Sequence, residues 1–507
     1  MISPIQALAR NIFSNWALTL TTIAIAFFMN PFLVHNLGKE QYGIWALVLS
    51  VVAYTGFLDA GLRQSLARYI PKYYAVKDYE GLNTVLNSSN VVYTASGSLV
   101  IVVTVLIALF LVGVFNVAPE LVRVMQIVLM VVGLNQAVRF YFLTSASLGP
   151  FHRYDVGNAI DVTAAIVTAL VIVFFIRRGY GLVAMAVITL AVSFLQFVAR
   201  RVAQKRIVPE VAYRLSYVSK SCIRELLGYG IISFLIVIAW MVIFNTQNVV
   251  IGIFLTSTDV TYYSIAGMMI NYLRTMIGAI AIPLVPAISH LDTTSNLKEI
   301  AALFNRLSNY LYYLCTGIGV AVLFFGGQFI YLWMGRDFQV TVNVLWILIV
   351  PACVYLPQFM ANSVLLGISR HKPLLYVLTA EAVGNIVLSV ILVKPLGVYG
   401  VALGTIIPQF IIYAFVFPYV FHRIIQGSLR SFYYNSGKMA LTALVFTVPP
   451  AFLTREYLPA WGWFGLVAKV AVLCAALLLG FWWRVLDRDT RAGLAARLPA
   501  FLRTRQR

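Results

Sequence analysis

The chain has 507 residues, of which 61% are hydrophobic and 11% are charged, and its formal net charge is +20. Soluble domains average about 25% charged residues, and continuous apolar runs of about twenty residues recur along the whole chain, which excludes a soluble protein and a transmembrane β-barrel. The basic residues lie in short loops and at the two ends, so the positive charge does not indicate nucleic-acid binding.

Apolar runs bounded by charged residues, proline and glycine predict an all-α polytopic membrane protein with fourteen membrane-spanning helices. We expect them near 7–33, 42–67, 83–114, 120–147, 155–176, 181–202, 224–251, 260–289, 297–325, 340–367, 373–393, 398–421, 436–453 and 462–485.

The distribution of basic residues predicts the orientation. One alternating set of loops, with the two ends, carries 27 of the 37 Lys and Arg, and the other set carries six. Because cytoplasmic loops are enriched in Lys and Arg, we expect both termini in the cytoplasm. The tail over 486–507 contains six arginines and is expected to lie on the anionic inner leaflet.

Two halves of the chain repeat. "LGPFHR" after the fourth helix matches "LGISRH" after the tenth, and "GYGLVA" before the sixth matches "VYGVAL" before the twelfth, at an offset of 218 to 219 residues. The repeat predicts two pseudo-symmetric six-helix bundles and two further helices. We expect five parts: 1–203, a basic cytoplasmic linker over 204–223, a second bundle over 224–422, two helices over 436–485, and the tail over 486–507.

Two arginines fall deep inside apolar runs. Gly267, Asn271, Arg274 and Gly278 share one face of the eighth helix, and Asn135 lies four residues before Arg139 in the fourth. An arginine at mid-depth costs roughly 2.5–3.5 kcal/mol on insertion scales. Either these arginines line a watery cavity that attracts an anion, or they bond to carbonyls or acids of neighbouring helices. Guanidinium binds phosphate oxygens bidentately and stays charged.

Acids also lie within the runs. Asp59 and Arg63 are four residues apart and can pair with each other. Asp161 and Glu381 lie at nearly equivalent positions of the two repeats. Each is a counter-ion for an arginine, a ligand for a coupling ion, or a hydrogen-bonding partner for sugar hydroxyls, and the sequence leaves these roles open.

Amide side chains and one proline add polar groups to two further helices. Asn30 precedes Pro31 in the first helix, and "FNTQN" in the seventh contains Asn245, Gln247 and Asn248. Proline removes a backbone hydrogen bond, so the first helix is expected to have either a static kink at Pro31 or a point there that bends during transport. The four cysteines and five histidines show no metal-ligand spacing, and no nucleotide-binding motif is present, so we expect no cofactor and no metal.

One stretch resembles a known family. "LVHNLGKEQYGIWALVLSVVAYTGFLDAGLRQSLARYIPKYYA" contains an L-G-x-x-x-Y-G turn (Leu37, Gly38, Tyr42, Gly43), then D-x-G-L from Asp59, then an aromatic and basic end. These motifs, and "YGVALGT" after the eleventh helix, resemble the polysaccharide-transporter branch of the multidrug/oligosaccharidyl-lipid/polysaccharide flippase superfamily. Members often carry an acid in the seventh helix where this chain has Asn248.

The resemblance implies flipping of undecaprenyl-pyrophosphate-linked oligosaccharides across the bacterial inner membrane by alternating access. It also implies a proton or sodium ion as the coupling ion, and polysaccharide polymerases as partners. On this reading Arg139, Arg274, Asn271, Asn135, Asn245 and Gln247 bind substrate, and Asp59, Arg63, Asp161, Glu381 and Asn30 act in coupling or gating.

Two alternatives remain. One is a multidrug or organic-cation antiporter of the same superfamily, whose cavity should be acidic. The other is a membrane enzyme of polysaccharide assembly, which usually needs a large outer loop, whereas the outer loops here are short. We therefore expect a transporter and not an enzyme.

The orientation can be tested with single cysteines. Tags at Asn116 and Thr256 are expected to react with an impermeant thiol reagent added outside intact cells, and tags at Leu215 and Ser428 are expected to react only after permeabilisation. The opposite pattern would overturn the assignment of the basic loops to the cytoplasm.

Overall fold

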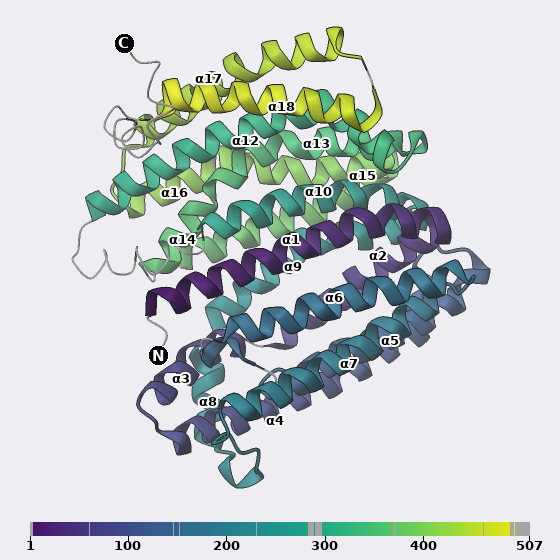
Figure 1. The fold of residues 1–507 in the computed structure, drawn as a ribbon, viewed down its shortest axis with the longest axis vertical. Helices are drawn as coiled ribbons and strands as arrows, with labels where there is room; N and C mark the ends of the chain where they lie inside the picture. The colour runs from purple at the N-terminus through teal and green to yellow at the C-terminus, as the bar shows by residue number, and fades with distance from the viewer. Residues whose placement is uncertain are drawn as a thin grey trace. The chain divides into compact units, whose positions relative to one another are not determined.

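The fold is given by a computed structural model (Figure 1). It describes residues 4–281, 288, 297–486 and 491, apart from residues 60, 146, 152, 230, 369, 371 and 460. The described part is helical throughout and contains no strand. Within it, twelve helical segments are long and apolar enough to cross a bilayer. The chain is thus an all-helical, multi-pass membrane protein, as the sequence predicts.

Two of the predicted helices lie in one of these segments. Lys372–Ile424 is 53 residues long and contains the helices predicted near 373–393 and 398–421. They are separated at Gly397, whose φ of 57° and ψ of −137° are not helical. A Cβ on Gly400 would overlap the carbonyl of Leu392, so the backbone turns tightly here.

The chain forms two compact units. The first contains residues 1–264 and 389–401, and the second contains the rest. The predicted boundaries near 203 and 224 separate the two sequence repeats, whereas the two units are defined by contacts. The predicted boundaries therefore stay predictions. Pro286, near the end of the helix predicted over 260–289, and most of the basic tail lie outside the described residues.

The first unit is a bundle of long helices. In Figure 1, α4, α5 and α7 run side by side, and α6 lies between α1 and α7, in agreement with their contacts. Its helices are α1 (Pro4–Leu37), α2 (Lys39–Ala53), α3 (Leu62–Ala75), α4 (Tyr79–Leu106), α5 (Pro119–Phe142), α6 (Tyr154–Arg177), α7 (Leu182–Ile207), α8 (Lys220–Tyr229), α9 (Ile231–Phe254) and the start of α10 (Ser257–Ala281).

In the second unit, the long helix α12 packs against α13, α17 and α18. Lys469 of α18 is buried there and donates to Gln328 Oε1 of α12 at 3.3 Å. The helices are the remainder of α10, α12 (Leu297–Trp333), α13 (Gln339–Tyr355), α14 (Phe359–Gly367), the remainder of α15 (Lys372–Ile411), α16 (Phe417–Ile424), α17 (Leu429–Tyr457) and α18 (Gly462–Gly480).

The helix predicted near 42–67 is broken. Helix α2 ends at Ala53, a 3-10 turn covers Tyr54–Asp59, and α3 begins at Leu62. Gly61 has a φ of 73°, in the left-handed region that glycine adopts without strain, and this interrupts the helix. The expectation of one continuous helix is therefore wrong: Asp59 ends the 3-10 turn, and Arg63 lies in the first turn of α3.

The segment between α7 and α8 is held on α4 by two buried asparagines. Asn83 donates to the Glu210 carbonyl at 3.1 Å and accepts from the Ala212 amide at 2.9 Å. One turn later, Asn87 donates to the Ala212 carbonyl and accepts from the Arg214 amide, both at 2.8 Å. Because the side chains pair with backbone groups as a neighbouring strand would, this loop is an ordered part of the first unit.

Glycine permits a close approach between α2 and α10. A Cβ on Gly43 would overlap the Ser257 carbonyl and crowd the Thr261 hydroxyl, and that hydroxyl donates to the Lys39 carbonyl at 2.5 Å. A side chain at position 43 would therefore push the helices apart, which explains the glycine in the L-G-x-x-x-Y-G turn.

Gly43→Ala is expected to destabilise the protein by roughly 1–3 kcal/mol, as overpacking does in close-packed interiors. Gly437→Ala in α17 is the control, because a Cβ there meets nothing within 4 Å. The midpoint of thermal unfolding in detergent should fall for the first variant and stay for the second. If Gly43→Ala unfolds at the same temperature as Gly437→Ala, the close approach between α2 and α10 is not required for stability.

Candidate functional site

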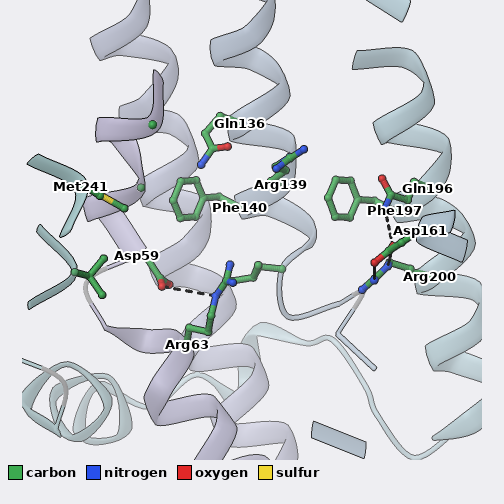
Figure 2. A pocket seen from close by; sticks show the side chains of 14 residues that line it. Asp59, Arg63, Gln136, Arg139, Phe140, Asp161, Gln196, Phe197, Arg200 and Met241 are labelled. Carbon is green, nitrogen blue, oxygen red and sulfur yellow. Dashed lines mark hydrogen bonds and ion pairs between the residues drawn. The ribbon is translucent and has the colours of Figure 1, made fainter. Parts of the chain in front are cut away.

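A polar pocket of about 640 Å³ lies within the first unit. The 3-10 turn after α2 and helices α3, α5, α6, α7 and α9 contribute its lining, and Figure 2 shows the side chains that face it. Its ionisable groups are three arginines and two aspartates: Arg63, Arg139, Arg200, Asp59 and Asp161. The pocket therefore has one positive charge in excess.

The first acid, Asp59, lies at the end of the 3-10 turn. Tyr93 of α4 donates to its Oδ1 at 2.6 Å, and Arg63 Nε lies 3.9 Å from its Oδ2. The Arg63 side chain is 73% exposed, so this ion pair is largely solvated and contributes little to stability. The short phenol bond is the firmer contact, and it leaves Arg63 able to turn toward a bound anion.

The second acid, Asp161, is held by α7. Arg200 reaches its two oxygens at 2.9 and 2.5 Å, and Gln196 donates to the first oxygen at 2.7 Å (Figure 2). This fork-to-carboxylate geometry is the strong form of an ion pair. Arg200 is thereby neutralised and fixed in place. Asn158, three residues before Asp161 in α6, donates to Ser14 and Asn15 of α1.

Arg139 differs from the other two arginines. It projects from α5 with an exposed side chain, and Phe140 and Phe197 lie on either side of it (Figure 2). Its guanidinium makes no hydrogen bond or ion pair with the residues that the structure describes, and Asp161 and Arg63 are the charged groups that act on it from a distance. Arg139 therefore offers its donors to whatever enters the pocket.

Four of the fourteen residues that line the pocket were predicted as site residues, and ten were not; the ten include the polar residues Gln136, Gln196 and Arg200 and the aromatic residue Phe197. Arg200 lies at the end of the helix predicted near 181–202, and Gln196 one turn earlier was a sequence signal for a polar face there. In α5 the buried amide is Asn135, and the amide that lines the pocket is its neighbour Gln136.

Three amides predicted to bind substrate or gate transport have local partners in the first unit. Asn30 donates to the Ala26 carbonyl at 2.6 Å and accepts from the Tyr42 hydroxyl at 3.0 Å. Asn245 donates to the Met241 carbonyl at 3.0 Å, and the buried Gln247 donates to the Ile243 carbonyl. These bonds satisfy backbone carbonyls within the helices, and the proposed roles of these residues remain predictions.

In the second unit, Arg274 of α10 is half-buried and donates to Asn271 Oδ1, as their shared face predicts. Glu381 of α15 is 1% exposed, and Gln409 donates to its Oε1 at 3.2 Å. Tyr413 lies beside the same carboxyl. Asn385, one turn after Glu381, is fully buried. Glu381, Asn385, Gln409 and Tyr413 form a second polar cluster, and none of them lines the pocket of the first unit.

A family model described as "Polysaccharide biosynthesis protein" matches residues 32–343, and this range includes every residue that lines the pocket. The chain belongs to the polysaccharide biosynthesis protein family. No curated protein sequence matches the chain.

Solved structures place the fold of this family member among transporters. The lipid II flippase MurJ in an inward closed conformation is similar with a TM-score of 0.71 and 14% identity, over 92% of this chain and 98% of that one. An inward-facing multidrug resistance MATE family transporter of the MOP superfamily has a TM-score of 0.67 and 16% identity, over 82% and 99% of the two chains.

A MOP superfamily transporter from Pyrococcus furiosus, for which a binding pocket of reverse polarity suggests a different function, is similar with a TM-score of 0.62 and 17% identity, over 84% of this chain and 96% of that one. At such identities the likeness shows the fold alone. The fold is thus shared by proteins whose pockets differ in charge, and substrate class has to be argued from the side chains.

Proposed function

We propose that this chain is a flippase that moves undecaprenyl-pyrophosphate-linked oligosaccharides from the inner to the outer leaflet of the bacterial inner membrane. Membership of the polysaccharide biosynthesis protein family and the transporter-like fold support this proposal. Both termini lie in the cytoplasm, and the two bundles alternate between inward-open and outward-open states. A proton or sodium ion drives the cycle, and polysaccharide polymerases use the product.

The observation that carries the proposal is the exposed Arg139 in a pocket with excess positive charge. A pyrophosphate is a polyanion with oxygens on every side, and guanidinium binds such oxygens with two parallel hydrogen bonds. Arg63 lies in the same pocket with a solvated side chain and can add a second contact. The isoprenoid tail can stay in the bilayer while the charged headgroup crosses.

The same observation separates this proposal from the antiporter alternative. An organic cation would be repelled by the net positive charge and would need an acid that is free to pair with it. In this pocket Asp161 is paired with Arg200, and Asp59 accepts from Tyr93 and faces Arg63. The charge balance therefore favours an anionic headgroup.

Arg139→Ala is expected to lower transport of lipid-linked oligosaccharide about ten- to a hundredfold, because a charge-assisted hydrogen bond is worth roughly 1.5–3 kcal/mol. Arg139→Lys keeps the charge but loses the fork and should fall between alanine and wild type. Arg274→Lys and Arg274→Ala should follow the same order if Arg274 also contacts the pyrophosphate. Transport is measured in proteoliposomes, with the amount of inserted protein determined for each variant.

The matched control is Arg123→Ala, which removes an exposed arginine from the same helix α5 outside the pocket lining. It should transport normally. If Arg139→Ala transports as well as this control, the pyrophosphate role of Arg139 is lost. If wild-type protein instead transports organic cations and Arg139→Ala speeds that transport, the antiporter alternative is right.

We further propose that Glu381 binds the coupling proton. A carboxylate buried beside an amide and a phenol is costly in the membrane interior, whereas the neutral acid is tolerated there. A conformational change that admits water to this cluster would therefore change its protonation.

Glu381→Gln mimics the neutral acid and should abolish the response of transport to an imposed pH gradient while the protein stays folded. Glu120→Gln, which changes an exposed acid in the first turn of α5, is the control and should respond like wild type. An undiminished pH response in Glu381→Gln would reduce Glu381 to a structural role. A response to a sodium gradient alone would name sodium as the coupling ion.

A further inference from the structure

Two phenylalanines flank Arg139, and they differ in what their ring faces contact. Phe140 is 5% exposed and belongs to the hydrophobic core of the first unit, where its ring stacks on Tyr93 with centroids 5.9 Å apart and planes 30° apart. Phe197 of α7 is only half-buried and lines the pocket. Of these two rings, Phe197 is the one with area left for a ligand.

Neighbouring aromatic rings fix the orientation of Phe197. Its ring is nearly parallel to that of Phe142 in α5, with centroids 6.0 Å apart and an interplanar angle of 16°. Phe142 is in turn held by the edge of Phe194, with centroids 5.9 Å apart and planes 88° apart. Three rings from two helices therefore support one another, and the Phe197 ring is a preorganised surface rather than a mobile side chain.

The surroundings of this ring are polar. Gln136 lines the pocket one turn before Arg139, and Gln196 precedes Phe197 while it donates to Asp161 (Figure 2). A flat apolar face combined with amide and guanidinium donors suits a ligand with an apolar face and polar edges. A pyranose ring has this character, because its C–H bonds present weakly positive hydrogens to the negative face of an aromatic ring while its hydroxyls point outward.

We propose that Phe197 is the stacking platform for the sugar directly attached to the pyrophosphate, and that Gln136 hydrogen-bonds a hydroxyl of that sugar. This assignment rests on the proposed function, since the pyrophosphate at Arg139 brings the sugar to the ring. It divides the pocket into a phosphate-binding part at Arg139 and a sugar-binding part at Phe197. A volume of about 640 Å³ falls within the usual range for pockets that hold small polar ligands.

The division is tested by comparing two lipids on the purified, detergent-solubilised full chain. The probes are undecaprenyl pyrophosphate and the same lipid carrying one galactose or one N-acetylglucosamine, and the measurement is Kd by native mass spectrometry. Wild-type protein should bind the sugar-bearing lipid more tightly. Phe197→Ala should reduce that preference about fivefold, the value of one aromatic contact, and leave the affinity for undecaprenyl pyrophosphate unchanged.

Three further variants sharpen the comparison. Phe197→Tyr keeps the ring and should retain the preference, and Gln136→Ala should reduce it. Leu195→Ala removes an exposed apolar side chain of the same helix outside the pocket lining and outside the three stacked rings, and should leave both affinities close to wild type. Arg139→Ala should weaken the binding of both lipids by the same factor, because Arg139 contacts the pyrophosphate that both lipids carry.

The possible failures are distinguishable. An unchanged preference in Phe197→Ala, or an equal loss for both lipids, overturns the sugar platform and leaves the pyrophosphate site standing. Wild-type protein that binds both lipids equally also overturns it. Wild-type protein that binds neither lipid overturns the proposed function, and the platform with it.

Discussion

Charge in the interior of a bilayer has to be compensated, and this constraint governs the arrangement of the first unit. An unpaired ionised side chain at mid-depth costs roughly 2.5–3.5 kcal/mol on insertion scales. Asp161 is held by the forked Arg200, and Asp59 by a short bond from Tyr93 with Arg63 nearby. Arg139 can keep an exposed side chain without an ion pair because the pocket into which it projects is lined by polar side chains. The pairing of the acids thus determines which arginine is available.

The sequence predicted the interactions that depend on local spacing. Asp59 and Arg63 are four residues apart and pair as expected, and Asn271 accepts from Arg274 three residues later. It could not predict the partner of Asp161, because Arg200 is 39 residues away and meets it only when α6 packs against α7. It also chose Asn135 over Gln136, since these residues lie four and three positions before Arg139 and helical spacing places both beside it.

The parts of the fold that the sequence missed depend on backbone conformation and on tertiary hydrogen bonds. The break before α3 comes from the left-handed Gly61, and no periodicity of apolar residues reports it. The loop between α7 and α8 has the basic composition of a linker, yet Asn83 and Asn87 hold its backbone on α4. Apolar run length predicts that a helix crosses the membrane, whereas buried amides determine which loops are rigid.

The acids in the pocket also bear on how a flippase could release its cargo. A pocket with three unpaired arginines would hold a pyrophosphate so tightly that release would limit every cycle, because a transport site must bind strongly enough to capture and weakly enough to let go. Pairing Arg200 with Asp161 removes one cation from direct contact, and on the proposed function Asp59 would compete with the pyrophosphate for Arg63. The carboxylates beside the arginines would then lower the affinity for the pyrophosphate. Selectivity would have to come from neutral contacts, such as an aromatic face and an amide, because these can recognise a sugar without adding charge that opposes release.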